Sequence, residues 1–314
     1  MTDTLPVLMR AAASHLLTTL DEELLARATR RFADDEARRW IEYRPRPRPG
    51  VSLAEIPAPA RKAVHRLLAT ALSPHAYAQV MAVTALEEVL DRREGWGRGR
   101  HSDDYWIAVF GHPADDRWAW RFEGHHISVT MTVAGDRISP SPVFLGANPA
   151  RVGYRGRAVS RPLAPEEDMA RELLTALSPA HRAAVIIADE APFDIVSGTS
   201  ARAEAWIQPL GMPATDLPLT ARGLLDELVA LYLDRLPDEL ARAESQRLTG
   251  PLHFAWAGSP DPGRRHYYRI QGEDLLIEYD NTSDDGNHAH TVLRRPASDF
   301  GDDILRRHHA ADHR

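Results

Sequence analysis

The 314-residue sequence contains no cysteine and only one lysine, Lys62. Without cysteine, the chain cannot form a thiolate nucleophile, an iron–sulfur cluster, a zinc ribbon or a disulfide framework. Lys62 lies outside any glycine-rich loop, so a P-loop is excluded and a Schiff-base lysine is not expected. Arginine therefore carries nearly all the positive charge, and guanidinium groups would hold any anionic ligand.

The sequence also lacks a basic stripe and a long apolar run. Its 45 acidic and 38 basic residues give a formal net charge of -7, which argues against nucleic acid as an obligate partner. No stretch approaches the roughly 18 apolar residues of a membrane span, and no export signal is evident at the N-terminus. We therefore expect a cytoplasmic protein without a membrane or nucleic-acid partner, acting on a small-molecule or peptide substrate.

Helical patterns dominate the first third of the chain. Residues 8–40 place leucines on one helical face, and residues 58–73 and 74–92 predict two further helices, the latter preceded by a Ser-Pro cap. Three prolines between residues 43 and 49 predict an extended segment that lies on the surface or across a groove. Its arginines, Arg44, Arg46 and Arg48, could clamp an anion, although a stiff spacer is the favoured interpretation.

Strand patterns occupy two blocks, at about residues 105–145 and 252–293, where aromatic and β-branched residues alternate with turns. Helical patterns at 163–191 and 219–248 lie between these two blocks. This arrangement predicts an α+β fold, with helices packed on one mostly antiparallel sheet built from both blocks. We expect a single domain over residues 1–314, with a helical subregion (1–92), a glycine- and arginine-rich loop (93–104) and a sheet-plus-helix body (105–314).

A short internal similarity links residues 67–74 (LLATALSP) with residues 173–179 (LLTALSP). A duplicated helical hairpin would explain it. Chance use of the same cap after a leucine-rich helix is the favoured explanation.

The first candidate site lies within residues 118–133. Aromatic residues from 118 to 122 alternate on one face, but the apolar residues from 127 to 133 fall on the opposite face of a continuous strand. The phase changes at Gly124-His125-His126, which predicts a β-bulge that redirects Glu123, His125 and His126. In the alternative interpretation, the strand is buried on both faces and its histidines are hydrogen-bonded in the core.

The second candidate site opens a strand with His288-Ala-His290, after a polar turn. Residues two apart on a strand point to the same face, which gives a sheet-based metal site two neighbouring nitrogen ligands. With Glu123 and Asp280 nearby in sequence, the two histidine pairs could form one shared metal or catalytic site. The plain alternative is an ordinary hairpin turn with solvated acidic residues.

We favour a metal-dependent enzyme, a hydrolase or an oxidoreductase, with ligands from His125 or His126 together with His288 and His290. Glu123 or Asp280 would be a carboxylate ligand or a general base. Nitrogen and oxygen ligands without thiolate admit zinc, iron, manganese or copper as the divalent metal.

Two alternatives stay open. One is metal-free acid–base catalysis by the same histidines and carboxylates. The other is a non-enzymatic cleft that binds a small ligand or peptide. The chain contains neither Gly-x-Ser-x-Gly nor His-Glu-x-x-His, so a serine hydrolase or a zincin-type protease is not supported by motif.

Longer segments resemble a bacterial family catalogued as domain of unknown function 3500. The resemblance rests on residues 120–128 (WRFEGHHIS), 144–150 (FLGANPA), 252–258 (LHFAWAG), 266–272 (HYYRIQG), 278–282 (EYDNT), 287–290 (NHAH) and 299–301 (DFG). It spans nearly the whole chain. The turn at 282–287 differs slightly from the family's more usual glutamine- and alanine-containing turn, but the flanking aspartate, asparagine and histidines are intact. The resemblance implies a unitary family member rather than a fusion, and it implies no mechanism.

Overall fold

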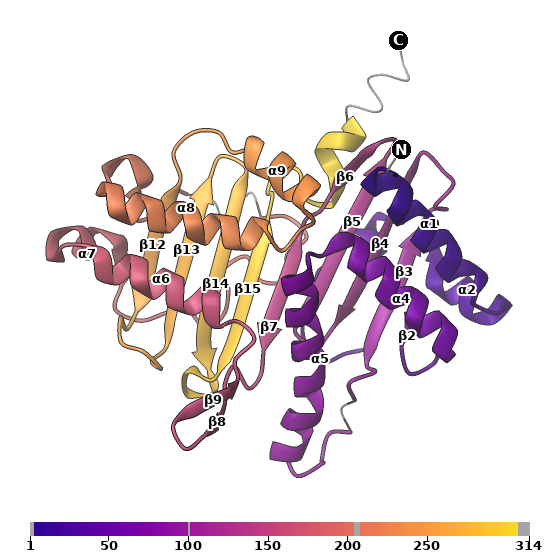
Figure 1. Ribbon diagram of the computed structural model, residues 1–314, viewed down its shortest axis with the longest axis horizontal. Helices are drawn as coiled ribbons and strands as arrows, with labels where there is room; N and C mark the ends of the chain where they lie inside the picture. Colours follow the sequence, from indigo (N-terminus) through magenta and orange to yellow (C-terminus); the bar gives the residue numbers. More distant parts are fainter. Residues whose placement is uncertain (1–2, 100, 204–207, 307–314) are drawn as a thin grey trace.

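The computed structural model describes residues 3–99, 101–203 and 208–306. Among these described residues, thirteen strands form one large, mostly antiparallel sheet with helices packed against it (Figure 1). The predicted α+β class and the shared sheet are therefore confirmed. Within the described ranges, no helix combines the length and apolar character needed to cross a bilayer.

In the first half of the chain, helices come before an antiparallel meander. The helical part contains α1 (Leu5–Thr18), α2 (Glu22–Ala28), β1 (Thr29–Arg30), α3 (Asp35–Arg38), β2 (Val51–Ser52), α4 (Ala58–Ala71) and α5 (Pro74–Arg93). The strands that follow are β3 (Tyr105–Phe110), β4 (Arg117–Gly124), β5 (Ile127–Ala134), the short β6 (Arg137–Ser139) and β7 (Val143–Ala147). The meander consists of β3, β4, β5 and β7, and the short β6 pairs with β5. The predicted helices at 58–73 and 74–92 correspond to α4 and α5.

The second half begins after a separate two-stranded hairpin, β8 (Val152–Tyr154) and β9 (Arg157–Ser160). Its helical part contains α6 (Ala164–Ala176), α7 (Pro179–Val185), β10 (Ile186–Ala188), β11 (Met212–Pro213), α8 (Leu219–Leu233) and α9 (Asp238–Gln246). The meander is β12 (His253–Gly258), β13 (His266–Gly272), β14 (Leu275–Ser283) and β15 (His288–Arg294). The helix predicted over 163–191 is therefore wrong at its C-terminal end, because β10 pairs with β12 and ends the helix at Val185.

The two halves follow the same plan. In the first, β1 runs parallel and β2 antiparallel to β3, the outermost strand of the antiparallel meander β3-β4-β5-β7. In the second, β10 runs parallel and β11 antiparallel to β12, the outermost strand of β12-β13-β14-β15. The meanders join through the antiparallel pair β7–β15, where Phe144 pairs with Val292. The sheet is thus symmetric about this junction, as a duplicated unit would make it.

The sequence supports this duplication. Gly50 and Gly211 open equivalent segments, GVSLAEIP and GMPATDLP, and both have positive φ, +111° and +76°. A Cβ at Gly50 would lie 2.2 Å from the carbonyl oxygen of Ile107, and one at Gly211 would lie 2.0 Å from that of Phe254. Since β3 and β12 are equivalent strands, both halves need glycine at the same place for the same close approach.

The short similarity between residues 67–74 and 173–179 does not come from this larger repeat, so the favoured explanation, the same type of cap after a leucine-rich helix, holds. By position, residues 173–179 (LLTALSP) correspond to residues 16–22 (LLTTLDE), where α1 ends and α2 begins. Asp21 and Ser178 cap α2 and α7 in the same way, accepting from the backbone N–H three residues later. The likeness to residues 67–74 reflects one more helix with the same type of serine cap.

The helices cover one face of the sheet, α4 and α5 over the first half and α6 and α8 over the second (Figure 1). On the opposite face at the β7–β15 junction, Phe144 and Val292 form a small buried cluster with three residues of the connecting segments, Ile41, Tyr43 and Ile195.

The predicted bulge at residues 124–126 is a hairpin turn instead. Gly124 pairs with Ile127, so His125 and His126 form the two-residue connection between β4 and β5. The apolar pattern changes phase because the chain reverses direction, and each strand keeps a regular alternation. The sequence signal was genuine, but it marked the end of a strand rather than an irregularity within one.

Candidate metal centre

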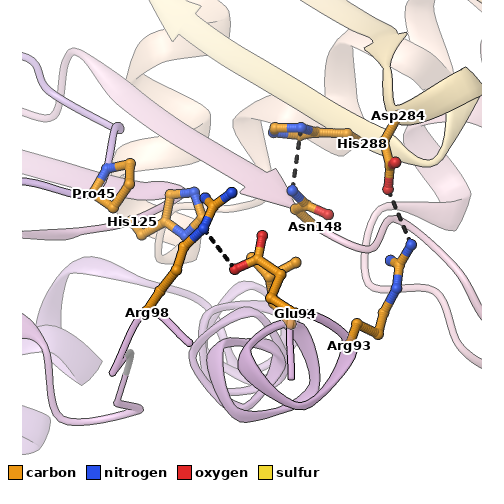
Figure 2. Close-up of a pocket in the computed structure, with 9 residues that line it drawn as sticks. Pro45, Arg93, Glu94, Arg98, His125, Asn148, Asp284 and His288 are labelled. Atoms are coloured by element: carbon orange, nitrogen blue, oxygen red, sulfur yellow. Dashed lines mark hydrogen bonds and ion pairs between the residues drawn. The ribbon is translucent and has the colours of Figure 1, made fainter. Parts of the chain in front are cut away.

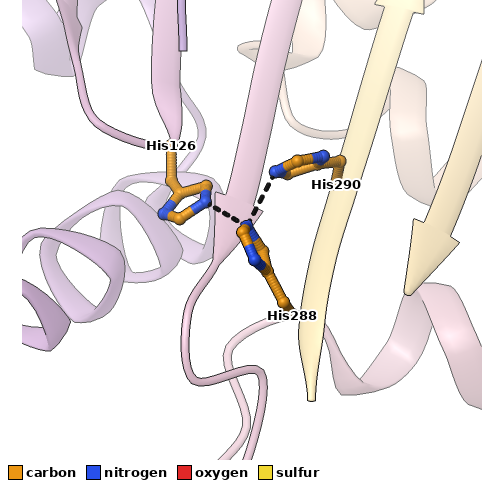
Figure 3. Close-up of side chains that lie close together, drawn as sticks. All are labelled: His126, His288 and His290. Carbon is orange, nitrogen blue, oxygen red and sulfur yellow. Dashed lines mark hydrogen bonds between the residues drawn. The ribbon is translucent and has the colours of Figure 1, made fainter. Parts of the chain in front are cut away.

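Three histidines from the two halves converge beside the β7–β15 junction. The Nε2 atom of His126 lies 2.7 Å from Nε2 of His288, which lies 3.0 Å from Nε2 of His290 (Figure 3). One ligand nitrogen from each ring falls within 4.8 Å of the other two. The structure therefore brings the two sequence pairs together, through His126 rather than His125.

The backbone of the β4–β5 turn fixes the position of His126. Its N–H donates to the carbonyl of Tyr43 at 3.0 Å, and its carbonyl accepts from the N–H of Gly146 at 2.7 Å. His126 has a φ of 65°, a left-handed conformation in which non-glycine residues are uncommon and which often marks functional sites. The ring is buried, at 2% exposure.

Gly146 on β7 makes room for the cluster. A Cβ at this position would lie 2.7 Å from Cδ2 of His126 and 3.0 Å from Cδ2 of His290. Glycine therefore lets the two imidazole rings pack over the strand between them.

His288 and His290 lie at the start of β15, on the same face as predicted from their spacing. His290 pairs with Gly146 on one side and with Asp280 on the other. His290 is buried, whereas His288 is half-buried. The cluster thus has a closed end at His290 and an accessible end at His288.

Carboxylates from two segments surround the outer nitrogen of His290. Its Nδ1 lies 2.8 Å from Oδ1 of Asp194 and 3.4 Å from Oδ2 of Asp280. The hydroxyl of Tyr43 donates to the other oxygen of Asp194 at 2.9 Å. Hydrogen bonds from Nδ1 to carboxylates leave Nε2 to face the other histidines, an arrangement typical of metal-ligating imidazoles.

These contacts also set the charge states. Burial lowers the pKa of His290, but the carboxylates of Asp280 and Asp194 outweigh burial and raise it to about 9. Burial raises the pKa of Asp194, and its hydrogen bond to His290 outweighs this effect and lowers it. Asp194 is therefore held as a carboxylate beside His290.

His288 has a polar partner on its outer nitrogen too. Nδ2 of Asn148, at the end of β7, lies 3.3 Å from Nδ1 of His288, while Oδ1 of Asn148 is buried without a partner. A 180° rotation of this amide would place the oxygen as an acceptor for Nδ1–H. That arrangement would again leave Nε2 of His288 to face the cluster.

His125 is held separately from the trio by Glu87 on α5. Its Nδ1 lies 2.5 Å from Oε1 of Glu87, and both side chains are buried. The hydroxyl of Tyr105 donates to the carbonyl of His125 at 2.9 Å. Glu87, His125 and His126 form a second group whose ligand atoms are close enough to hold an ion.

The predicted carboxylates have different positions. Asp280 joins the cluster through His290, and Asp194, Asp280 and His290 form a third group that could hold an ion. Glu123 does not join the cluster. It is buried on β4, where it pairs with Arg121 at 2.8 Å and accepts from Ser128 at 3.4 Å. Burial raises the pKa of Glu123 against the opposing effect of Arg121.

The arginines of the proline-rich segment are not equivalent. Arg44 and Arg46 pair with Glu42 and are exposed. Arg48 is buried and donates to the carbonyl of Gly124 at 2.8 Å, so it supports the histidine turn from behind. The segment is thus more than the simple surface spacer that the sequence favoured.

A cleft of about 430 Å³ opens beside the trio and the Glu87–His125 pair (Figure 2). His125, His288 and Asn148 contribute polar groups, and Pro45 and Leu90 contribute apolar surface. The charged lining consists of Arg93, Glu94, Arg98 and Asp284. The volume lies in the usual range of small-molecule sites, and a ligand there would reach His288 from solvent.

Sequence reasoning missed three groups around the trio. Glu87 did carry a signal, because it is a charged residue on the buried stripe of α5 that includes Val80, Val83 and Leu90. Asn148 lies within residues 144–150, a segment that contributed only to the family resemblance. Asp194 lies in a connecting segment without a motif, and only the fold brings it to His290.

Comparison with known proteins identifies a family but no characterised relative. No curated protein and no solved structure matches this chain. A family model described as "Protein of unknown function (DUF3500)" matches residues 6–302, nearly the whole sequence. The chain is therefore a member of the DUF3500 family.

Proposed function

We propose that this protein is a metal-dependent enzyme in which His126, His288 and His290 hold a divalent transition metal. The convergence of three imidazole nitrogens from two distant segments supports the proposal, with distances of 2.7 and 3.0 Å between successive Nε2 atoms. Nitrogens on a tetrahedral ion with bonds of about 2.0–2.1 Å lie about 3.3 Å apart. The two contacting pairs of nitrogens would therefore need to separate by about 0.3–0.6 Å.

The surroundings of the trio favour a metal over a purely structural cluster. Asp194 and Asp280 orient His290, and Asn148 contacts His288. Such outer partners fix the ring orientation and increase the basicity of ligating histidines. Three protein ligands leave a coordination position for a substrate or water, as in catalytic rather than structural sites.

A bound ion would supply Lewis-acid chemistry or, for iron or copper, redox chemistry. The residues around it divide the remaining tasks. His288 and Asn148 face the cleft and would contact the substrate, while His125 with Glu87 offers an imidazole held by a carboxylate beside it. We therefore assign the protein to the hydrolases or oxidoreductases, with Asp280 as an orienting carboxylate.

Elemental analysis of natively purified protein tests this proposal. We expect near-stoichiometric zinc, iron, manganese or copper in the wild type and less than a tenth of it in a His288→Ala/His290→Ala double variant. Glu273→Ala, in the equivalent turn of the other half, is the matched control and should keep the metal. Wild-type protein that stays metal-free after reconstitution with each of these ions would contradict the proposal.

A second candidate function is metal-free acid–base catalysis, and the contact of 2.5 Å between Glu87 and His125 favours it. A carboxylate on Nδ1 holds an imidazole in one orientation and stabilises its protonated form, as in other His–carboxylate pairs. Under this function, turnover would survive exhaustive chelation and would fall at least tenfold in Glu87→Gln. Loss of turnover on chelation, with recovery on metal addition, would exclude it.

A further inference from the structure

The rim of the cleft carries two arginine–carboxylate ion pairs that the proposed metal chemistry does not use. Arg93 at the end of α5 lies 3.2 Å from Asp284, and Arg98 lies 3.0 Å from Glu94. All four residues line the cleft beside His125 and His288 (Figure 2). The cleft therefore presents two cationic and two anionic groups.

The two pairs differ in their exposure to solvent. The side chains of Arg93 and Asp284 are 43% and 46% exposed, and those of Arg98 and Glu94 are 61% and 24% exposed. The Arg93–Asp284 pair is open to solvent on both sides, and such exposed pairs typically contribute little to stability. A ligand could open this pair at small cost, provided that it offers each partner a replacement charge.

A simple anion would satisfy only half of this requirement. If it displaced Asp284 from Arg93, the aspartate would lose this arginine partner. A ligand with both a carboxylate and an ammonium group would repair both sides of an opened pair. Arginine binds carboxylates through paired N–H donors, and a carboxylate accepts from an ammonium group.

From this arrangement we propose that the cleft binds a small zwitterion, an amino acid or a short peptide with free termini. Its carboxylate contacts Arg93 or Arg98, and its ammonium group contacts Asp284 or Glu94. The side chain rests against Leu90 and Pro45, the apolar part of the lining. This inference deepens the proposed function, since it names the substrate class for the same site.

The Arg93–Asp284 pair also explains why such a ligand would be held at the junction. Arg93 belongs to the first half of the chain and Asp284 follows β14 in the second. A zwitterion inserted between them would contact both halves, directly beside the His126–His288 contact that also joins them.

Isothermal titration calorimetry on the full-length protein tests the inference, with free leucine and glycyl-leucine as probes. N-acetyl-glycyl-leucine and glycyl-leucinamide are the blocked analogues. We expect binding by at least one free probe and at least tenfold weaker binding when either terminus of the peptide is blocked. Arg93→Gln/Arg98→Gln and Glu94→Gln/Asp284→Asn should each weaken binding by a similar factor.

Arg92→Gln is the matched control, because Arg92 lies in the same last turn of α5 but does not line the cleft. Its binding should equal that of the wild type. No binding of either free probe at millimolar concentration, or equal binding of the blocked peptides, would overturn the inference.

Metal content measured on the same samples separates this inference from the proposed function. Zwitterion binding without metal would leave the cleft assignment standing and remove the metal centre. Metal without zwitterion binding would do the reverse.

Discussion

The two halves of the sheet each have a two-residue hairpin turn at the same position. The side chains of one turn contact other histidines, and those of the other turn form hydrogen bonds and ion pairs. Gly124 and Ile127 flank His125-His126 in the first half, and Gly272 and Leu275 flank Glu273-Asp274 in the second. The scaffold is the same in both, from the parallel edge strand to the glycine before the turn. The difference therefore lies in the side chains that each turn meets.

Asp274 meets partners that neutralise and anchor it. It accepts from Ser298 Oγ at 2.7 Å, from the N–H of Ala297 at 2.9 Å and from Arg247 at 3.2 Å. Neither Glu273 nor Asp274 is among the residues with positive φ. The carboxylate of Asp274 therefore stabilises the local structure around this turn.

His126 occupies the position in the first half that Asp274 occupies in the second, but it has different contacts. His126 has a strained left-handed conformation and meets His288 and His290 rather than a salt-bridge network. Counting back from the Phe144–Val292 pair, the positions of His288 and His290 correspond to Pro140 and Pro142 before β7. The comparison teaches that one copy of a repeated scaffold can keep stabilising ion pairs while the other assembles a histidine cluster.

The largest expected effect comes from filling the space under the histidines. In Gly146→Ala, the new Cβ would meet the rings of His126 and His290 at 2.7 and 3.0 Å. We expect a loss of about 1–3 kcal/mol in the free energy of unfolding and metal affinity reduced about 100-fold. Urea unfolding and chelator competition measure the two effects.

Gly223→Ala is the control for this substitution. Gly223 lies within α8, and a Cβ there would meet nothing within 4 Å. The change should stabilise the protein by about 0.5–1 kcal/mol and leave the metal in place. Unchanged metal affinity in Gly146→Ala would show that the close approach of the rings is not needed for binding.

Acid should weaken the second half of the sheet through His266, whose equivalent in the first half is the non-titrating Trp118. His266 stacks on Trp256 and Tyr279, and burial lowers its pKa from 6.5 to about 4. The unfolded state therefore binds more protons between these values, and the stabilisation present above pH 6.5 is lost as the pH falls towards 4. The loss should be on the order of 3 kcal/mol, at about 1.4 kcal/mol per pKa unit.

Urea midpoints at pH 7, 5.5 and 4.5 measure this effect in the wild type and in His266→Phe, which keeps an aromatic ring in the stack. The variant should show a shallower decline with falling pH. Parallel curves for the two proteins would assign the acid sensitivity to other groups.

Asp274→Ala should damage the second turn alone. It removes the acceptor of Ser298 Oγ and of the N–H of Ala297, and one of the three carboxylates that pair with Arg247. This should cost about 1–3 kcal/mol in the free energy of unfolding. Metal content should equal that of the wild type. A loss of metal in this variant would break the distinction between a structural and a functional turn.

The smallest change in stability is expected for Asp194→Asn, beside the histidine cluster. The side chain of Asp194 is 32% exposed, and asparagine keeps an oxygen that can accept from His290 or from Tyr43, so the loss of the charge should lower stability only modestly. Metal affinity should fall about 10–100-fold, as for other residues that orient a ligating histidine. Chelator competition measures it, and wild-type affinity would show that Asp194 does not act through His290.

Much of the architecture was predictable from periodicity and turn residues. The strands at 105–145 and 252–293 and the helices α4 and α5 follow from regular patterns and from the Ser73 cap. The β4–β5 turn was misassigned because a phase change looks the same whether the chain bulges or reverses. Glu87 and Asp194 could not be assigned to the site, because side chains from α5 and from a connecting segment meet His125 and His290 only after the sheet has formed.

The sequence by itself determined which chemistry is possible: no thiolate, one lysine, and histidines at spacings that suit nitrogen ligation. It also contained the repeat, in glycines such as Gly50 and Gly211 that close backbone contacts require. Only the tertiary structure decided that His126, rather than His125, meets His288 and His290, and that Asp280 lies at the cluster while Glu123 pairs with Arg121. The reason is physical: local patterns fix which face a residue occupies, whereas the pairing of β7 with β15 fixes which faces meet.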